Sequence, residues 1–381
     1  MITKVPFYRH DLGQAEVDAV AEVLRGPILT TGSTVERFER RLAEYLGARE
    51  VVGVTSCTGA MHLSLLALGI GPGHEVITTP MTFIATATAI MEAGATPVFA
   101  DVEPTTGNLD VARVEPVITE RTRAIMPVHL YGQMCDMRGL RALADRHRLA
   151  IVEDSAHCVE GRRDGVRPGQ LGETACLSFY ATKALTCGEG GAVVTNDAAL
   201  AARLRLLRLH GMTKAAFDRH REGYQHWDMV VLGWKYNMDN IQAALMLPQL
   251  ERLELNAERR QELAQRYRAE LAGIPGVRWP DVLPGVRHAW HVFPIWVGPD
   301  RRDAVVAGLQ AQGIPTVVNY RAIHLLTYFR EMFGFVPGRF PIAERIGDAT
   351  LSLPFYPGMP TDETDIVVAG VRAVMTGAPG A

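Results

Sequence analysis

One lysine of this chain lies where the sequence could give it a chemical role. Only four of the 39 basic residues are lysines, the others being arginines: Lys4, Lys183, Lys214 and Lys235. Lys183 follows the apolar run ACLSFY and precedes the glycine-rich segment GEGG at 188–191. A lysine between a buried strand and such a turn loses hydration, which lowers its pKa and frees a nucleophilic amine. The alternative is a solvated loop lysine.

A carboxylate and a group of hydroxyls also stand at the ends of apolar runs. Asp154 ends the run LAIVED, where a buried carboxylate is costly unless a cation meets it. Residues 56–60, SCTGA, follow the run VVGVT and open a helix, whose free N–H groups and dipole favour an anion. Both features have a plainer interpretation as N-caps, because Asp, Ser and Thr are common at that position.

An amine, an isolated carboxylate and an anion cradle are together what pyridoxal phosphate requires. Its aldehyde needs a lysine, its pyridinium nitrogen needs an acidic partner, and its phosphate favours a helix N-terminus. Its ring also needs a flat apolar face, and Phe83 in PMTFIAT lies at another strand end. GEGG does not match GxGxxG, and no such motif follows the first strand. A dinucleotide-dependent oxidoreductase is therefore disfavoured.

The predicted elements that position these residues alternate between strands and helices from about residue 33 to 210. A helix capped by Ser33 and Thr34 and ended by Gly47 comes first. Seven runs then predict strands, most of them apolar throughout, as in a sheet buried on both faces: VVGVT, EVITT, TPVFADV, TRAIMPVHL, LAIVEDS, ACLSFY and GAVVTND. The alternation predicts an α/β fold with a doubly wound, mostly parallel sheet, in which ligands bind at the carboxyl ends of strands.

The pattern changes after residue 237. Residues 240–271 predict one long helix that Pro248 should kink. HAWHVFPIWV and IPTVV predict strands, and 301–312 and 361–375 predict helices. We therefore expect a large cofactor-binding domain over 1–254 and a smaller α+β domain over 255–381. His288 and His291 lie three residues apart on the first of these strands and so face opposite sides. We predict packing or surface roles for them, and no metal site.

Composition narrows the class of protein. The 381 residues are 48% hydrophobic and 21% charged, as in globular proteins, and the net charge of −3 gives no basic field for a nucleic acid. Five scattered cysteines without a CxxC motif indicate reduced thiols. The first residues lack the apolar segment of a signal peptide, and no run of 18 apolar residues occurs. These features predict a cytoplasmic protein without a membrane span.

Several long blocks of the sequence resemble the DegT/DnrJ/EryC1/StrS sugar aminotransferases, which are pyridoxal-phosphate enzymes of fold type I. The blocks run from ILTTGSTVERFE through VTSCTGAMHLSLLALGIGPGHEVITTPMTF, VEDSAHCVEG and LSFYATKALTCGEGGAVVTND to LGWKYNMDNIQAAL. Within the family the chain is most similar to enzymes of the UDP-4-amino-4-deoxy-L-arabinose type, which aminate a 4-keto group. The shared features are KYN at 235–237, HAWHVF, and RAIH at 321–324.

The resemblance implies a role for each site residue. Lys183 would form the Schiff base with the cofactor and act as the catalytic residue, and Asp154 would pair with the pyridinium nitrogen. His157, where many relatives carry Gln, would lie against the ring or its 3-hydroxyl, and Phe83 would cover the ring. The phosphate would be held by Thr58, Gly59 and Ser178, the partner subunit would supply Lys235 and Asn237, and the substrate would meet Thr31, Tyr131 and His324. Many relatives carry Asn and Arg where this chain has Lys235 and Asn237.

The same resemblance implies ping-pong transamination in a homodimer with shared active sites. L-Glutamate would give its amino group to the cofactor and leave as 2-oxoglutarate. A nucleotide-linked keto-sugar would then take the amino group, most readily at C4. Two alternatives stay open at this stage: an aminotransferase for a 3-keto sugar or cyclitol ketone, and a non-catalytic regulator that binds the cofactor. Lys183 argues against the dehydratases of the family, which carry His in its place.

Overall fold

The fold is built on a central sheet of seven strands. The computed structural model describes residues 4–214 and 226–377. The strand order is β1-β8-β7-β5-β4-β2-β3, and β8 alone runs against its neighbours β1 and β7. The bounds are β1 Glu50–Val54, β2 Glu75–Thr78, β3 Thr96–Phe99, β4 Thr122–Ile125, β5 Ala150–Asp154, β7 Thr174–Ser178 and β8 Gly191–Thr195. All seven predicted strands are present, and the expected mostly parallel sheet is confirmed.

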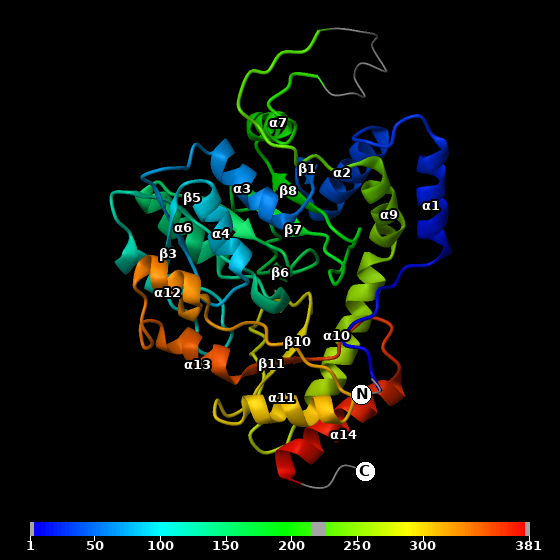
Figure 1. The fold of residues 1–381 in the computed structure, drawn as a ribbon, viewed down its shortest axis with the longest axis vertical. Coiled ribbons are helices and arrows are strands. Elements are labelled where there is room, and N and C mark those ends of the chain that lie inside the picture. The colour runs from blue at the N-terminus through cyan, green and yellow to red at the C-terminus, as the bar shows by residue number, and fades with distance from the viewer. Residues whose placement is uncertain (1–3, 215–225, 378–381) are drawn as a thin grey trace.

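Helices cover both faces of this sheet (Figure 1). They bury its apolar side chains in separate clusters, one built around α3 and another around α2 and α9. Several helices begin at an aspartate that accepts backbone N–H bonds, among them α6 at Asp136, α7 at Asp197 and α9 at Asp239. The bounds are α1 Gln14–Arg25, α2 Ser33–Leu46, α3 Cys57–Ala67, α4 Ile84–Glu92, α5 Val111–Val114, α6 Met137–His147, α7 Ala198–Leu207 and α9 Asn240–Glu251.

The C-terminal elements form a second apolar core below the sheet in Figure 1. Strands β10 (Phe293–Trp296) and β11 (Thr350–Leu353) pair antiparallel there. Helix α10 (Leu253–Leu271) begins in the core of the sheet at Leu253 and ends in this second core at Leu271. The other elements are α11 Arg302–Ala311, α12 Thr327–Phe333, α13 Pro341–Ala349, α14 Thr361–Thr376 and the short pair β6 Arg162–Arg163 and β9 Val286–Arg287. A division at residue 254 stays a prediction.

Three expectations about this half of the chain need correction. The helical stretch 240–271 is broken at Arg252, and Pro248 lies inside α9. HAWHVFPIWV is a strand only from Phe293, because Trp290 adopts φ 50° and its N–H donates to His288 Nδ1 at 2.9 Å. That local bond competes with a sheet ladder. IPTVV forms no strand, and Val317 makes a single bridge to Ser352.

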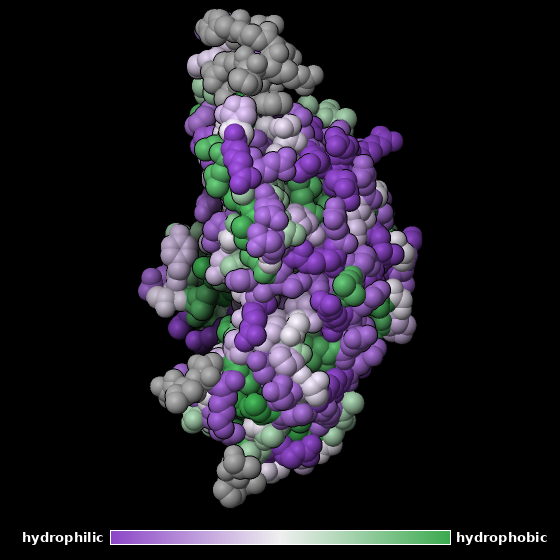
Figure 2. All heavy atoms as spheres, turned by 90° about the vertical axis from the view of Figure 1, so that its right-hand side faces the viewer, coloured by the Kyte–Doolittle hydropathy of each residue, from purple (hydrophilic) through white to green (hydrophobic). Residues whose placement is uncertain are grey.

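The outer surface is mainly polar. Figure 2 shows this for the right-hand side of Figure 1, where apolar residues gather only in small groups. Within 4–214 and 226–377, no helix is both long and apolar enough to cross a membrane.

Candidate active site

A cavity of about 650 Å³ lies where the predicted site residues meet. Six of them line it, and they come from the carboxyl ends of β1, β2, β5 and β7 or from the segments that follow these strands: Thr58, Phe83, Asp154, His157, Ser178 and Lys183. These four strands run in parallel, so their carboxyl ends share one edge of the sheet. The fold therefore brings together residues that lie up to 125 positions apart in the sequence, from Thr58 to Lys183.

The loop after β7 holds Lys183 against the cavity. Its ends are tied together because Phe179 N–H donates to the Gly190 carbonyl at 2.8 Å. Its middle is anchored to α9, where Gln249 bonds the Thr186 backbone N–H and carbonyl. Burial lowers the pKa of Lys183 to about 8, although nearby Cys57 and Asp154 oppose that shift. A minor fraction of the amine, about one tenth at pH 7, is therefore neutral and nucleophilic.

Asp154 is a buried carboxylate with neutral hydrogen-bond partners. Its Oδ2 accepts from the Thr86 hydroxyl at 2.7 Å, and its Oδ1 accepts from the Ala156 N–H at 3.1 Å. Thr86 in turn lies 2.7 Å from the Thr82 hydroxyl, so the two threonines form a short chain. Burial raises the pKa of Asp154, while these hydrogen bonds and Lys183 lower it.

These contacts test whether a cationic ring would fit. In the described part of the chain, Asp154 forms no ion pair with an arginine or lysine. It nevertheless borders a cavity large enough for a small ligand and is only 5% exposed. A buried carboxylate lacking a cation is costly, and a protonated pyridine nitrogen in the cavity would remove that cost. The residues present thus fit pyridoxal phosphate.

The N-terminus of α3 borders the cavity. Ser56 caps the helix, since its Oγ accepts from the Gly59 N–H at 3.0 Å. Gly191 fixes this turn against β8, because a Cβ there would lie 2.4 Å from the Ser56 carbonyl carbon. Thr58 and Ser178 line the cavity beside the turn, whereas Gly59 lies just behind it. Both the capping interpretation and the anion interpretation are compatible with this geometry.

His157 is locked in one tautomer. Its Nδ1 accepts from the Tyr131 backbone N–H at 3.2 Å, so its proton sits on Nε2, 3.1 Å from the Tyr320 hydroxyl oxygen. Burial and Lys183 hold the pKa of His157 well below its usual value, so the ring is neutral. Tyr131 itself lies outside the cavity lining and donates its hydroxyl to the Asn319 carbonyl at 2.5 Å. Phe83, 54% exposed, lies 5.9 Å from the Tyr320 ring at the cavity.

Four other predicted residues lie away from this cavity. Lys235 Nζ donates to Asn237 Oδ1 at 2.5 Å, and Asn237 donates to the Thr31 hydroxyl at 2.7 Å. Thr31, Lys235 and Asn237 thus form one cluster, and none of the three lines the cavity. His324 is buried against Phe340 and bonds Glu344 at 3.0 Å, so its contacts are those of packing.

The site also contains residues that sequence reasoning missed or misplaced. His291 lies 3.2 Å from Lys183 Nζ, contrary to the packing or surface role we expected for it. The cause is the departure from strand geometry at Trp290. Phe7 and Tyr8 also line the cavity, although the N-terminal segment carries no motif that could have revealed them. The sequence signal for Tyr320 is its place as an aromatic residue next to RAIH.

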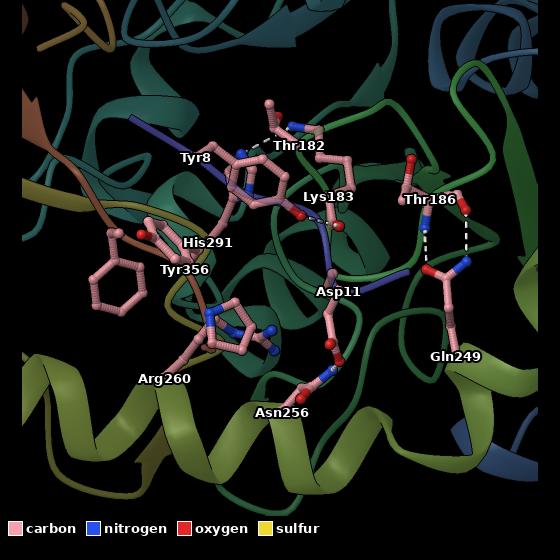
Figure 3. Close-up of a pocket in the computed structure, with 13 residues that line it drawn as sticks. Tyr8, Asp11, Thr182, Lys183, Thr186, Gln249, Asn256, Arg260, His291 and Tyr356 are labelled. Carbon is pink, nitrogen blue, oxygen red and sulfur yellow. Dashed lines mark hydrogen bonds between the residues drawn. The ribbon is translucent and has the colours of Figure 1, made fainter. Parts of the chain in front are cut away.

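A small polar cavity of about 20 Å³ lies behind Lys183 and His291. Figure 3 shows Tyr8 directing its hydroxyl to the Lys183 carbonyl, at 3.4 Å, with Arg260 and Asn256 rising from α10. A space of this size holds about one water molecule. Arg260 is paired with the buried Glu160 and donates to the Ala289 carbonyl at 3.1 Å. The positive charge of Arg260 is therefore already balanced by Glu160.

The chain is similar to known proteins over nearly its whole length. The chain is 41% identical to the spore coat polysaccharide biosynthesis protein SpsC of Bacillus subtilis, with 98% of both chains covered. It superposes on DesV of S. venezuelae with a TM-score of 0.91 at 37% identity, covering 98% of this chain and 99% of that one. Spr1654 of Streptococcus pneumoniae, named as a sugar aminotransferase and solved in its PMP form, gives a TM-score of 0.93 at 29% identity and covers 99% and 100%.

The family assignment rests on nearly the whole sequence. The pattern of the DegT/DnrJ/EryC1/StrS aminotransferase family matches residues 10–372, which include every site residue described above except Phe7 and Tyr8. With the matching fold and the arrangement of Lys183 and Asp154 around one cavity, the chain belongs to the DegT/DnrJ/EryC1/StrS aminotransferase family.

Proposed function

We propose that this protein transfers an amino group from L-glutamate to the C4 keto group of a nucleotide-linked sugar. It is an aminotransferase for sugars, and its cofactor is pyridoxal phosphate. The observation that carries the proposal is the pairing of a neutralisable amine, Lys183, with a buried carboxylate, Asp154, in one cavity. The C4 position and the nucleotide rest on the resemblance of KYN, HAWHVF and RAIH to enzymes of the UDP-4-amino-4-deoxy-L-arabinose type.

The chemistry is divided between the cofactor and two side chains. Bound pyridoxal phosphate supplies the electron sink that stabilises a carbanion next to the transferred nitrogen. Asp154 keeps the proton on the ring nitrogen by holding a negative charge beside it. Lys183 Nζ, once free, removes the proton from the substrate carbon and returns a proton on the other side of that nitrogen. A pKa of about 8 suits an amine that must both take and give a proton.

The remaining contacts bind and orient. We assign the phosphate to Thr58 and Gly59 at the start of α3, where the helix dipole favours an anion, and to Ser178 at the end of β7. Phe83 would cover one face of the bound ring. His157, neutral and fixed by Tyr131 and Tyr320, lies against the ring or its 3-hydroxyl.

A second copy of the chain would complete the site. The cluster of Thr31, Lys235 and Asn237 lies outside the cavity of its own chain, and exposed apolar residues precede it: Met229, Val230 and Leu232, exposed by 52%, 55% and 68%. An exposed apolar segment of this kind favours a protein interface. We therefore propose a homodimer in which this cluster reaches the partner's cavity. Five free cysteines support a reducing, cytoplasmic location.

Visible absorption tests the cofactor and the donor together. The purified protein with pyridoxal phosphate should be yellow and should bleach when L-glutamate is added. A yellow protein indifferent to L-glutamate would contradict the donor, and a protein that stays colourless would contradict the cofactor site. The bleached protein should then aminate one member of a panel of UDP-, dTDP- and GDP-linked 4-keto sugars, as read by mass spectrometry. Amination of only 3-keto sugars or cyclitol ketones would overturn the C4 proposal.

Mixed dimers test the shared site. K183A and K235A variants should each be inactive alone, and mixing them after mild dissociation should restore part of the activity. Restoration requires one intact site built from two chains. If K235A is fully active, or if the mixture stays inactive while both variants form dimers, the shared site is wrong.

A further inference from the structure

His291 contacts the amine of Lys183 from a position that the protein fixes on several sides. Its Nε2 lies 3.2 Å from Lys183 Nζ. Its backbone N–H donates to the Tyr131 carbonyl at 3.0 Å, and its ring lies 4.3 Å from the His157 ring at an angle of 32°. The imidazole separates the main cavity from the small polar cavity behind it and borders both. None of these contacts depends on a bound ligand.

The chemistry of the pair decides which atom donates. Burial holds the pKa of His291 well below its usual value, and the nearby charges of Lys183 and Arg260 add to the effect. The ring is therefore neutral and has one acceptor nitrogen. A protonated lysine has only donors, so His291 Nε2 accepts from Lys183 Nζ and the His291 proton lies on Nδ1.

Other groups around the pair do not replace this contact. Titratable and charged groups from several elements face Lys183 or His291: Cys57 of α3, Asp154 at the end of β5, His157 after β5, Tyr8 and Asp11 of the N-terminal segment, Arg260 of α10, and Tyr320. His157 uses both ring nitrogens on Tyr131 and Tyr320. Across 4–214 and 226–377, His291 is the side chain with a hydrogen bond to Lys183 Nζ.

We propose that His291 is a positioning residue for Lys183: its Nε2 accepts a hydrogen bond from the free amine and fixes the rotation of that amine. An amine that commits one N–H to His291 leaves its lone pair and its other hydrogen to the cavity. The lone pair is then oriented before the substrate proton is removed, which saves the cost of ordering it during the reaction. This inference rests on the proposed function, in which Lys183 Nζ carries the proton.

Two substitutions at His291 and one nearby control separate positioning from packing. H291L removes the acceptor, whereas H291Q keeps an acceptor oxygen close to the place of Nε2. H288N is the matched control, because His288 is also buried, belongs to the same segment and lies outside both cavities, and asparagine keeps an acceptor for the Trp290 N–H. Thermal unfolding of all three should show folded proteins, and H291M serves if H291L does not fold.

The first readout uses the cofactor-free protein. The labelling rate of each lysine by trinitrobenzenesulfonate is measured against pH and assigned by peptide mass spectrometry, with protection by pyridoxal phosphate marking Lys183. Wild-type Lys183 should show an inflection near its pKa of about 8. In H291L the inflection should move to lower pH, because the ammonium loses an acceptor in a buried site. H291Q and H288N should keep the wild-type inflection.

The second readout uses the enzyme loaded with cofactor. H291L should lower kcat roughly tenfold or more while the KM for the keto-sugar changes little, since orientation and not binding is lost. H291Q should recover most of the rate. The proposal is overturned if H291L leaves the Lys183 inflection in place, or if folded H291Q behaves as H291L does. An active K183A would instead contradict the proposed function and leave the labelling result intact.

Discussion

Two buried carboxylates stand next to each other on β5, and the protein treats them in opposite ways. Glu153 and Asp154 point to opposite faces of the sheet because strand side chains alternate. Glu153 is fully buried, and its oxygens accept from the Gly169 and Gly172 N–H groups at 3.1 and 3.0 Å. It also accepts from His129 Nε2 at 2.8 Å, since His129 Nδ1 already accepts from the Cys135 N–H.

The two carboxylates differ in whether their hydrogen-bond partners can change from donor to acceptor. Backbone N–H groups only donate, and His129 is held in one tautomer, so every partner of Glu153 is a fixed donor. The partners of Asp154 include a hydroxyl, Thr86, that can rotate and either donate or accept. Glu153 thus has a structural role, whereas Asp154 can still accept a hydrogen bond from a ligand. A buried charge is evidence of a site only when its partners leave it unsatisfied.

The largest expected effect comes from D154N. The change removes the negative charge that we propose for the ring nitrogen, and activity should fall on the order of 10²-fold or more, as for other preorganised charges. Stability without cofactor should not fall, because Thr86 can turn and accept from the new amide. Steady-state kinetics and thermal unfolding check both parts. A D154N enzyme with near-normal turnover would contradict the role of Asp154.

E153Q should give the reverse result. The new amide would point a donor at His129 Nε2, which is itself a donor, and the clash should cost about 1–3 kcal/mol of unfolding free energy. Urea unfolding measures this loss. The folded fraction should keep wild-type kcat. If E153Q instead lost turnover without losing stability, the division between the two carboxylates would fail.

T86V should produce a smaller change on the Asp154 side. Valine removes the hydroxyl that donates to Asp154 Oδ2, so the carboxylate becomes harder to ionise. We expect a loss of several-fold in activity, corresponding to about 1 kcal/mol for one hydrogen bond. T86S, which keeps the hydroxyl, is the control and should retain activity. Equal losses in T86V and T86S would indicate packing as the cause.

The smallest effect should appear in the pH dependence of stability without cofactor. The raised pKa of Asp154 means that the folded state holds this proton more tightly than the unfolded state does. Its share of stability is fully present below the ordinary aspartate pKa of 3.8 and is lost as pH rises through the higher pKa of the folded state. The melting temperature of D154N should therefore exceed that of cofactor-free wild type at neutral pH. If D154N and cofactor-free wild type melted identically at every pH from acid to neutral, the raised pKa of Asp154 would be contradicted.

Much of the sheet and the central pair could be predicted from local sequence. Apolar runs ending at a reactive residue located Lys183 and Asp154, because parallel strands place their ends at one edge. Other residues of the site reach the cavity through contacts that no local sequence pattern indicates. Phe7 comes to the cavity through a backbone bond from the Phe355 N–H to its carbonyl. His291 is turned inward by the left-handed backbone of Trp290, which a run of apolar residues conceals. The same runs do not distinguish Glu153 from Asp154, since side-chain partners such as Gly169 for Glu153 and Thr86 for Asp154 lie elsewhere in the sequence.

The central claim is that Lys183, and no other lysine, holds the cofactor. The direct test is to reduce the yellow protein with borohydride, digest it and locate the cofactor mass by peptide sequencing in a mass spectrometer. With only four lysines in the chain, the outcome is unambiguous. The account predicts that the added mass is found on Lys183 and is absent from K183A. The added mass on Lys4, Lys214 or Lys235, or on no peptide, would contradict it.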